Sequence, residues 1–316
     1  MGEAALVGAA FLYGSTFVAV QDGVEDLTPA AFLALRFGLA AGVLAPLALR
    51  RGRRPLLRAA WWPAGVLAGV ALFGGYVLQT VGLQYTTTSS SAFVTGLYVV
   101  FTPLVALVAL RRSPAPAVLA AVPLAVLGLL LLTGGGGGLG RGDAITLGGA
   151  VCFAIWLVVQ DAHSRRLDPV AFVTVQVAIV AAGSAVAMLP AGVGRVTGRS
   201  LLAVAFTGAL ATSVAFLLQL AGQRRVGPTR AALLLLLEAV FAGLLGYGVG
   251  ERLGPAGLVG AGLILVSILV AEVPAGRHAH GPDRSLTGQG QGATIGRPPS
   301  RRSEDALWPT PPSSRV

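Results

Sequence analysis

Two charged side chains lie inside long apolar segments of this 316-residue chain. Glu238 follows the leucine run Leu233–Leu237, and Arg36 lies within the apolar segment 29–49. If these segments cross a membrane, each charge near the centre costs at least about 3 kcal/mol on insertion scales. Both side chains must therefore face the interior of a helix bundle, a watery cavity or a partner.

A carboxylate at that depth has three possible roles. Glu238 can take a proton from one side and release it on the other, it can pair with a cationic solute, or it can form a permanent contact with a neighbouring helix. Arg36 can bind an anionic group of a solute, neutralise Glu238, or extend to the membrane surface as an anchor. We expect Glu238 to couple transport to protons and Arg36 to recognise the solute.

Weaker candidates are polar or aromatic residues in other apolar segments. Hydroxyl groups interrupt the first segment, and Gln176 holds the place of Arg36 in a second copy of the unit described below. Two glutamines lie on related segments, where we expect them near opposite faces of the membrane, and two rings can contact an organic solute. Each residue can equally serve helix packing alone. These candidates are Ser15, Thr16, Gln79, Tyr98, Trp156, Gln176 and Gln219.

The elements that must position these residues are membrane-spanning helices. Apolar residues make up 54% of the chain and charged residues only 11%, whereas a soluble domain carries about a quarter charged residues. Most long segments have the length of a span, about 17–25 residues. The sequence predicts an all-α polytopic membrane protein with ten spans: 3–21, 29–49, 60–81, 89–110, 117–133, 144–162, 169–189, 200–221, 228–249 and 254–272.

The chain is built from a duplicated unit. Three segments of the first part recur about 140 residues later in the second part: Val18–Asp22 as Val158–Asp161, Pro29–Phe32 as Pro169–Phe172, and Leu78–Gly82 as Leu218–Gly222. Each unit holds five spans, and because five is odd the second copy must be inverted. We expect residues 1–138 to form the first repeat, 139–273 the second, inverted repeat, and the Pro- and Gly-rich residues 274–316 a disordered cytoplasmic tail.

Charge sets the predicted orientation. Loops on the N-terminal side of the spans hold twelve arginines, and the opposite loops hold four. Positive charge favours the cytoplasmic side, so we expect a plasma-membrane protein with both termini in the cytoplasm. The arginines of the Arg50–Arg58 loop should also attract anionic lipids. All 23 basic residues are arginine, and since most of them lie in short loops we expect no nucleic-acid binding.

Metal, cofactor and catalytic sites are not expected. Cys152 has no second cysteine to pair with, and the three histidines lie outside the predicted spans. An intramembrane enzyme needs nucleophiles, bases or metal ligands at membrane depth, and only Glu238 titrates there. A membrane sensor or assembly protein that binds a ligand without moving it remains an alternative. Nothing in the sequence specifies the oligomeric state.

Several motifs across residues 3–272 resemble the EamA-type family of the drug/metabolite transporter superfamily. They are the segment Leu12–Phe17 with Tyr13 in place of the usual Trp, the segment Pro29–Phe37, the segment Ala92–Pro103, and Leu237–Ala239 followed by Gly250–Leu253, with Ala239 in place of the usual Pro. The resemblance implies two five-helix repeats. It also implies a secondary carrier, typically an exporter, for a metabolite, an amino acid or a drug. Uptake by the same fold remains an alternative.

Overall fold

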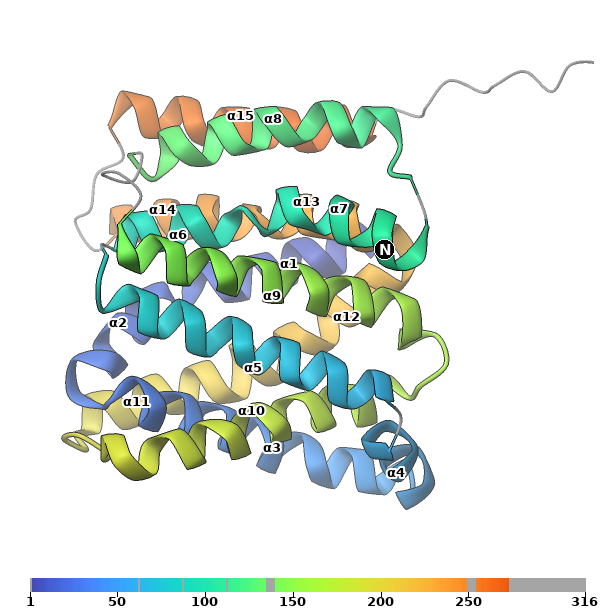
Figure 1. The fold of residues 1–316 in the computed structure, drawn as a ribbon. Helices are drawn as coiled ribbons and strands as arrows, with labels where there is room; N and C mark the ends of the chain where they lie inside the picture. Colours follow the sequence, from blue (N-terminus) through green and yellow to red (C-terminus); the bar gives the residue numbers. More distant parts are fainter. Residues whose placement is uncertain are drawn as a thin grey trace, which may run out of the picture. The chain divides into compact units, whose positions relative to one another are not determined.

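Helices arranged as ten rods form the described part of the molecule, which in this computed structural model comprises residues 2–61, 63–86, 88–111, 113–134, 140–248 and 254–272 (Figure 1). The predicted tail lies outside these residues. The first five rods are α1 (Gly2–Ser15) with α2 (Phe17–Asp26), α3 (Pro29–Arg50), α5 (Pro63–Leu83), α6 (Thr88–Gly96) with α7 (Tyr98–Leu110), and α8 (Pro116–Leu132). The next five are α9 (Arg141–Ser164), α10 (Pro169–Ala191), α11 (Gly198–Phe206) with η1 (Thr207–Val214) and α12 (Ala215–Val226), α13 (Pro228–Leu235) with α14 (Leu237–Gly248), and α15 (Pro255–Glu272).

Nine of the ten rods have the length, or nearly the length, and the apolar character of membrane spans. Within the described residues, seven are at least 18 residues long and apolar enough to cross a bilayer, and α8 and α15 are apolar but slightly shorter. The first rod continues to Asp26, beyond the predicted end at residue 21. The prediction of an all-α polytopic membrane protein is confirmed.

Equivalent caps start the second rod of each half. The hydroxyl of Thr28 accepts a hydrogen bond from the Ala31 backbone N–H (3.3 Å), and the carboxylate of Asp168 accepts one from the Ala171 N–H (2.9 Å). A proline follows each cap at the first helical position, where its missing N–H has no cost. The two caps hold the same position in the two copies, as the duplication requires.

The two halves run in opposite directions. In Figure 1, α1 begins at the right of the view and α9, its equivalent, begins at the left. Five rods lie before α9, so the inverted relation predicted from the odd number of spans is confirmed.

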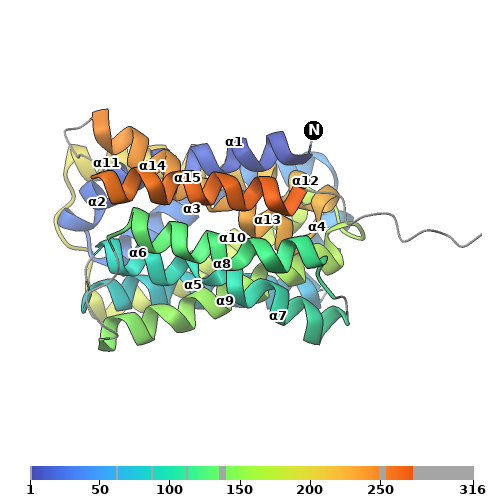
Figure 2. The same ribbon diagram turned by 90° about the horizontal axis from the view of Figure 1, so that it is seen from above.

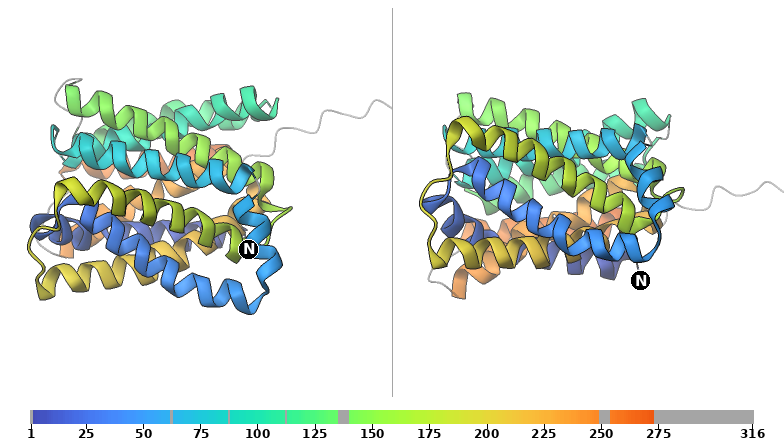
Figure 3. Two further views of the ribbon diagram at one scale, coloured as in Figure 1. Left: turned by 60° about the horizontal axis from the view of Figure 1, so that its bottom comes forward. Right: turned by 90° about the horizontal axis from the view of Figure 1, so that it is seen from below.

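The halves pack into each other across their whole length. Helix α5 packs along α9, and its equivalent α12 packs along α1. Helices α3 and α10 form a third contact between halves, seen side by side in Figure 3, and α8 and α15 form a fourth, seen in Figure 2. Because every one of these contacts joins a first-half helix to a second-half helix, the middle of the bundle is a seam between repeats.

We call the two ends of the bundle by their charge. The arginine-rich end is where α3 ends and α10 begins, and the opposite end is where α2 ends and α3 begins. The predicted loop at 50–59 is partly helical here, because α4 (Arg53–Trp61) turns Ala59 against Ala171 and Val175 of α10. The described arginines of the arginine-rich end are Arg50, Arg51, Arg53, Arg54, Arg58, Arg111, Arg165, Arg166, Arg224, Arg225 and Arg230.

Candidate functional site

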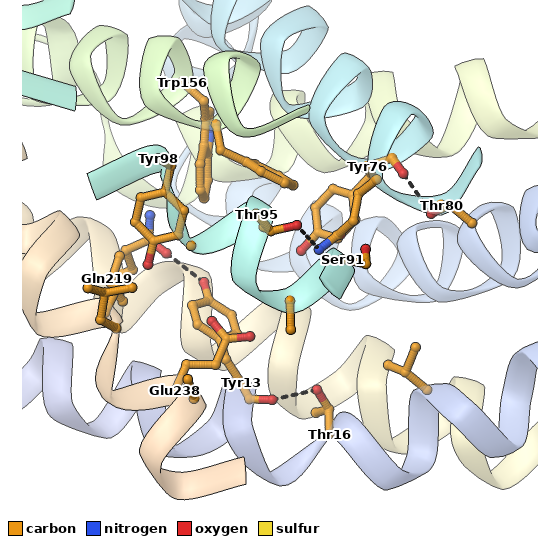
Figure 4. Close-up of a pocket in the computed structure, with 18 of the residues that line it drawn as sticks. Tyr13, Thr16, Tyr76, Thr80, Ser91, Thr95, Tyr98, Trp156, Gln219 and Glu238 are labelled. Atoms are coloured by element: carbon orange, nitrogen blue, oxygen red, sulfur yellow. Dashed lines mark hydrogen bonds between the residues drawn. The ribbon is translucent and has the colours of Figure 1, made fainter. Parts of the chain in front are cut away.

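A cavity of about 280 Å³ lies in the seam between the halves. Its wall contains both members of seven pairs of positions that the duplication makes equivalent: Tyr13 and Phe153, Thr16 and Trp156, Tyr76 and Phe216, Gln79 and Gln219, Thr95 and Leu235, Gly96 and Leu236, and Tyr98 and Glu238. The duplication therefore builds the site twice, once from each repeat, around a shared space. Figure 4 shows many of these side chains around the cavity.

Three of the rods are interrupted beside the cavity. The interruptions are single residues between consecutive helices: Thr16, Leu97 and Leu236. The backbone N–H of each donates to the carbonyl oxygen of the residue three positions earlier, with N···O distances of 3.1, 3.2 and 3.1 Å. Such tight turns leave backbone carbonyls outside the regular helical pattern, as in the discontinuous helices of carriers. Tyr98 directly follows the interruption at Leu97, and Glu238 lies two residues after the one at Leu236. The break before Glu238 forms although Ala239 replaces the proline of the family motif.

Arg36 lies on the cavity wall and is held from three sides. Its Nε donates a hydrogen bond to Thr212 Oγ1 at 2.9 Å, and its guanidinium carbon lies 5.5 Å from the ring centre of Phe37 and 5.6 Å from that of Tyr76. The side chain is only 5% exposed. Cation–π contacts and a charge-assisted hydrogen bond together stabilise a guanidinium away from bulk water.

The partner of Arg36 belongs to a π-helical segment, η1. There the hydroxyl of Ser213 donates to the carbonyl of Gly208, five residues earlier. A Cβ on Gly208 would lie 2.8 Å from the backbone oxygen of Arg36, so a glycine is needed for α3 and η1 to approach this closely. Because π-helical turns are frequent at functional sites, this segment supports a functional role for Arg36.

Glu238 lines the same cavity without a protein partner. Among the described residues, its carboxylate has no hydrogen bond and forms no ion pair, with Arg36 or any other cation. The alternative in which Arg36 neutralises Glu238 by direct contact is therefore not observed. The backbone of Glu238 itself packs closely against α1, since a Cβ on Gly14 would lie 2.7 Å from the backbone carbonyl oxygen of Glu238.

Aromatic rings form a continuous chain around the cavity. Ring centres lie 5.9 Å apart for Tyr13 and Phe216, 5.4 Å for Phe216 and Trp156, 6.4 Å for Trp156 and Phe153, and 5.3 Å for Phe153 and Tyr76. These distances and the edge-on or tilted angles are those of favourable aromatic pairs. The site therefore offers ring faces to the apolar body of an organic solute.

Hydrogen bonds orient two of these rings. The Tyr13 hydroxyl donates to Gln219 Oε1 at 2.7 Å, and Trp156 Nε1 donates to Gln176 Oε1 at 2.6 Å. Gln79 Nε2 donates to Thr95 Oγ1 at 3.1 Å, and both side chains lie on the cavity wall. Gln219 Nε2 is buried and has no partner in the described structure, which leaves a donor for a ligand.

The structure brings seven of the nine expected residues onto one wall: Thr16, Arg36, Gln79, Tyr98, Trp156, Gln219 and Glu238. Gln79 and Gln219, expected near opposite faces, meet at this one cavity. Ser15 is not on the wall, and its hydroxyl donates to the Leu12 carbonyl of its own helix. Gln176 is also absent from the wall and lies behind Trp156.

Several wall residues are not among those expected from the sequence. Tyr13, Tyr76, Phe153 and Phe216 are the main ones, and they could have been found because they form two pairs at equivalent positions of the two copies. Within the described residues, no group of three or more His, Cys, Asp or Glu side chains could hold a metal ion.

The described cavity extends toward one end of the bundle, the opposite end, where α2 ends and α3 begins. On that side its wall continues through Val24 of α2, Leu33 of α3 and Ser91 of α6. Toward the arginine-rich end, the described wall stops at Arg36 on α3, Leu157 on α9 and Gln219 on α12. Within the described residues, the cavity therefore occupies only the half of the seam nearer the opposite end. We call this the accessible half and the remainder of the seam the closed half.

Comparison with known proteins agrees with this geometry. The chain is 30% identical over 266 residues to an Archaeoglobus fulgidus protein described as an uncharacterized transporter, covering 84% of this chain and 83% of the relative. It is 26% identical over 279 residues to the uncharacterized transporter YyaM of Bacillus subtilis, covering 84% and 92%. A solved crystal structure has the same fold, with a TM-score of 0.77 at 21% identity, covering 87% of this chain and 97% of that one.

The family model of EamA-like transporters matches the chain twice, over residues 1–134 and 140–272. The two matches coincide with the two inverted halves of the fold and together contain the whole cavity wall. The chain is an integral membrane transporter and belongs to the EamA-like transporter family.

Proposed function

We propose that this transporter is a secondary active carrier that exports a small organic solute in exchange for protons, by alternating access between its two repeats. The observation that carries the proposal is Glu238, a carboxylate without a protein partner on the wall of a cavity between inverted halves. A carboxylate placed there can bind a proton or a solute in turn, and carriers of this architecture hold their sites at such a seam.

The walls support a solute with both apolar and polar groups. The aromatic chain can hold a flat or apolar body, Arg36 can bind an anionic group, and Gln219 retains a free donor. A metabolite, an amino acid or a drug fits this description. No catalytic step is part of the proposal.

We propose the orientation from the arginine distribution. If the arginine-rich end is cytoplasmic, both termini are cytoplasmic and the accessible half of the path faces outward from the plasma membrane. We assign residues 1–138 to the first repeat, 139–273 to the second and 274–316 to a cytoplasmic tail.

Anionic lipids are a proposed partner of α4. Arg53 and Arg54 are exposed on this helix beside Leu57, which is 55% exposed, while Ala59 faces α10. A helix with this pattern can lie in the headgroup region. Transport measured in vesicles with and without phosphatidylglycerol should lose its lipid dependence in the Arg53→Gln, Arg54→Gln double variant, and an unchanged dependence would remove this partner.

The carrier proposal is tested by reconstitution of the full chain. A growth screen of an overexpressing strain against toxic amino-acid analogues and antimicrobials identifies a solute. Flux of that labelled solute is then measured in proteoliposomes with an internal pH-sensitive dye. We expect solute movement to drive proton movement in the opposite direction.

The matched variants are Glu238→Gln and Glu25→Gln. Glu238→Gln should abolish proton-dependent flux from about pH 5.5 to pH 8, because an amide cannot carry the proton. Glu25→Gln should transport normally, since Glu25 lies at the exposed opposite end in a pair with Arg199. Unchanged flux in Glu238→Gln would exclude the coupling role, and solute binding without any flux would indicate a sensor.

A further inference from the structure

Buried polar atoms without partners gather at the closed end of the path. Gln160 and Ser164 on α9 and Gln223 on α12 are each at most 1% exposed. The Gln160 Nε2, the Ser164 Oγ and the Gln223 Oε1 have no hydrogen-bond partner in the described structure. Burying an unpaired polar atom is costly, and such atoms in a native fold require an explanation.

The symmetry of the repeats supplies that explanation. Counted back from the equivalent prolines Pro29 and Pro169, an offset of 140, the first-repeat positions that match Gln160 and Ser164 are Val20 and Val24. Both valines line the accessible half of the cavity. Inverted repeats exchange their conformations when a carrier changes state. In the opposite state, Gln160 and Ser164 would then face an open path, where water or solute can bond to them.

A second set of contacts holds this end closed. Arg224 of α12 donates through Nη2 to the carbonyl oxygens of Ser164 and Leu167, which lie at and beyond the end of α9. Gln223, also on α12, donates through Nε2 to the carbonyl oxygen of Leu157 on α9. An arginine on the last carbonyls of a helix is a favourable charge-assisted contact.

We propose that Gln160, Ser164 and Gln223 line the closed half of the transport path, and that Arg224 is the residue that keeps this half closed. The inference rests on the proposed alternating access and adds the residues of the second half. It also assigns the two halves different solute environments, since the valines of the accessible half are replaced by polar side chains in the closed half. The closed half would therefore receive a hydrated, polar solute.

Thiol accessibility tests the proposal in the full chain. In a Cys152→Ala background, Ala232→Cys places a thiol at a fully buried position near the start of α13, and Ala92→Cys places one at the equivalent position on the cavity wall. A membrane-impermeant thiol reagent is applied from either side of oriented vesicles. We expect Ala92→Cys to react from the opposite end and Ala232→Cys to be protected.

Adding Arg224→Ala should raise the labelling rate of Ala232→Cys from the arginine-rich end at least about tenfold, because two charge-assisted bonds are lost. Arg225→Ala is the matched control, since it removes the same charge from an exposed neighbour on α12 and should leave labelling unchanged. Equal labelling in the two arginine variants would overturn the role of Arg224.

The lining residues are tested by giving the closed half the valines of the accessible half. Gln160→Val with Ser164→Val should lower labelling of Ala232→Cys several-fold and slow transport, because opening no longer hydrates buried polar atoms. Retained labelling of Ala92→Cys shows that these variants are folded. Unchanged labelling of Ala232→Cys would overturn the lining. If the variants change the labelling as expected but the chain moves no solute, the proposed lining and closing contacts stand and the proposed carrier function is rejected.

Discussion

Arg36 and Gln176 hold the same place in the two repeats but have different surroundings. Arg36 lines the cavity and bonds to Thr212 on the π-helical segment, whereas Gln176 is fully buried and accepts a hydrogen bond from Trp156. One position therefore faces the cavity, and its equivalent supports the wall from behind. The duplication provides two related walls, and divergence at equivalent positions gives them separate tasks.

The same divergence separates Tyr98 from Glu238. Each follows a helix interruption on the cavity wall, but only Glu238 carries a charge. The two charged wall residues thus come from different repeats, one from each, and face a shared space without pairing to each other.

The largest expected effect on transport comes from removing the difference between Arg36 and Gln176. Arg36→Gln gives the first repeat the residue of the second and should lower kcat/KM for the solute by about a hundredfold or more, because a buried charged contact is lost. Arg36→Lys keeps the charge but lacks the Nε donor, and should recover only part of the activity. Wild-type kcat/KM in Arg36→Gln would contradict the recognition role.

A smaller loss is expected when only the support of Arg36 is removed. Thr212→Val deletes the acceptor of the 2.9 Å bond and should lower kcat/KM by about tenfold, the scale of one charge-assisted hydrogen bond. Thr212→Ser should restore activity because it returns the hydroxyl. Failure of the serine variant to recover would indicate that Thr212 acts through packing.

In the second repeat, a change at the equivalent position, Gln176, should lower the stability of the fold and not the recognition of the solute. Gln176→Leu leaves the Trp156 N–H buried without an acceptor and should lower the free energy of unfolding by about 1–3 kcal/mol. The measurement is thermal unfolding in detergent, combined with Trp156→Phe in a double-mutant cycle. Additive effects of the two changes would show that the hydrogen bond contributes nothing.

The smallest effect is expected outside both repeats. Deleting residues 277–316 should leave transport unaltered, because this Pro- and Gly-rich segment has too few apolar residues to pack against the bundle. Flux in proteoliposomes checks this, with insertion verified separately. A correctly inserted truncation that has lost activity would give the tail a function.

Much of this architecture could be predicted because apolar length and repetition are local properties of the chain. The ten spans, the duplication and the odd number of helices per unit follow from the segments themselves. Glu238 and Arg36 could be singled out because a charge inside an apolar segment is costly wherever it lies. The helix α4 and the π-helical segment η1 could not be predicted, since Ala59 and Thr212 acquire their roles only through contacts with α10 and Arg36.

The sequence by itself determined that this protein crosses the membrane as two inverted five-helix units with a charged residue from each. Only the tertiary structure decided that Gln79 and Gln219 meet at one cavity, that Ser15 and Gln176 stay off its wall, and that the described cavity occupies one half of the seam. The physical reason is that the cost of burial arises residue by residue and is visible in the sequence. Which side chains face each other depends on how helices far apart in the chain pack across the seam.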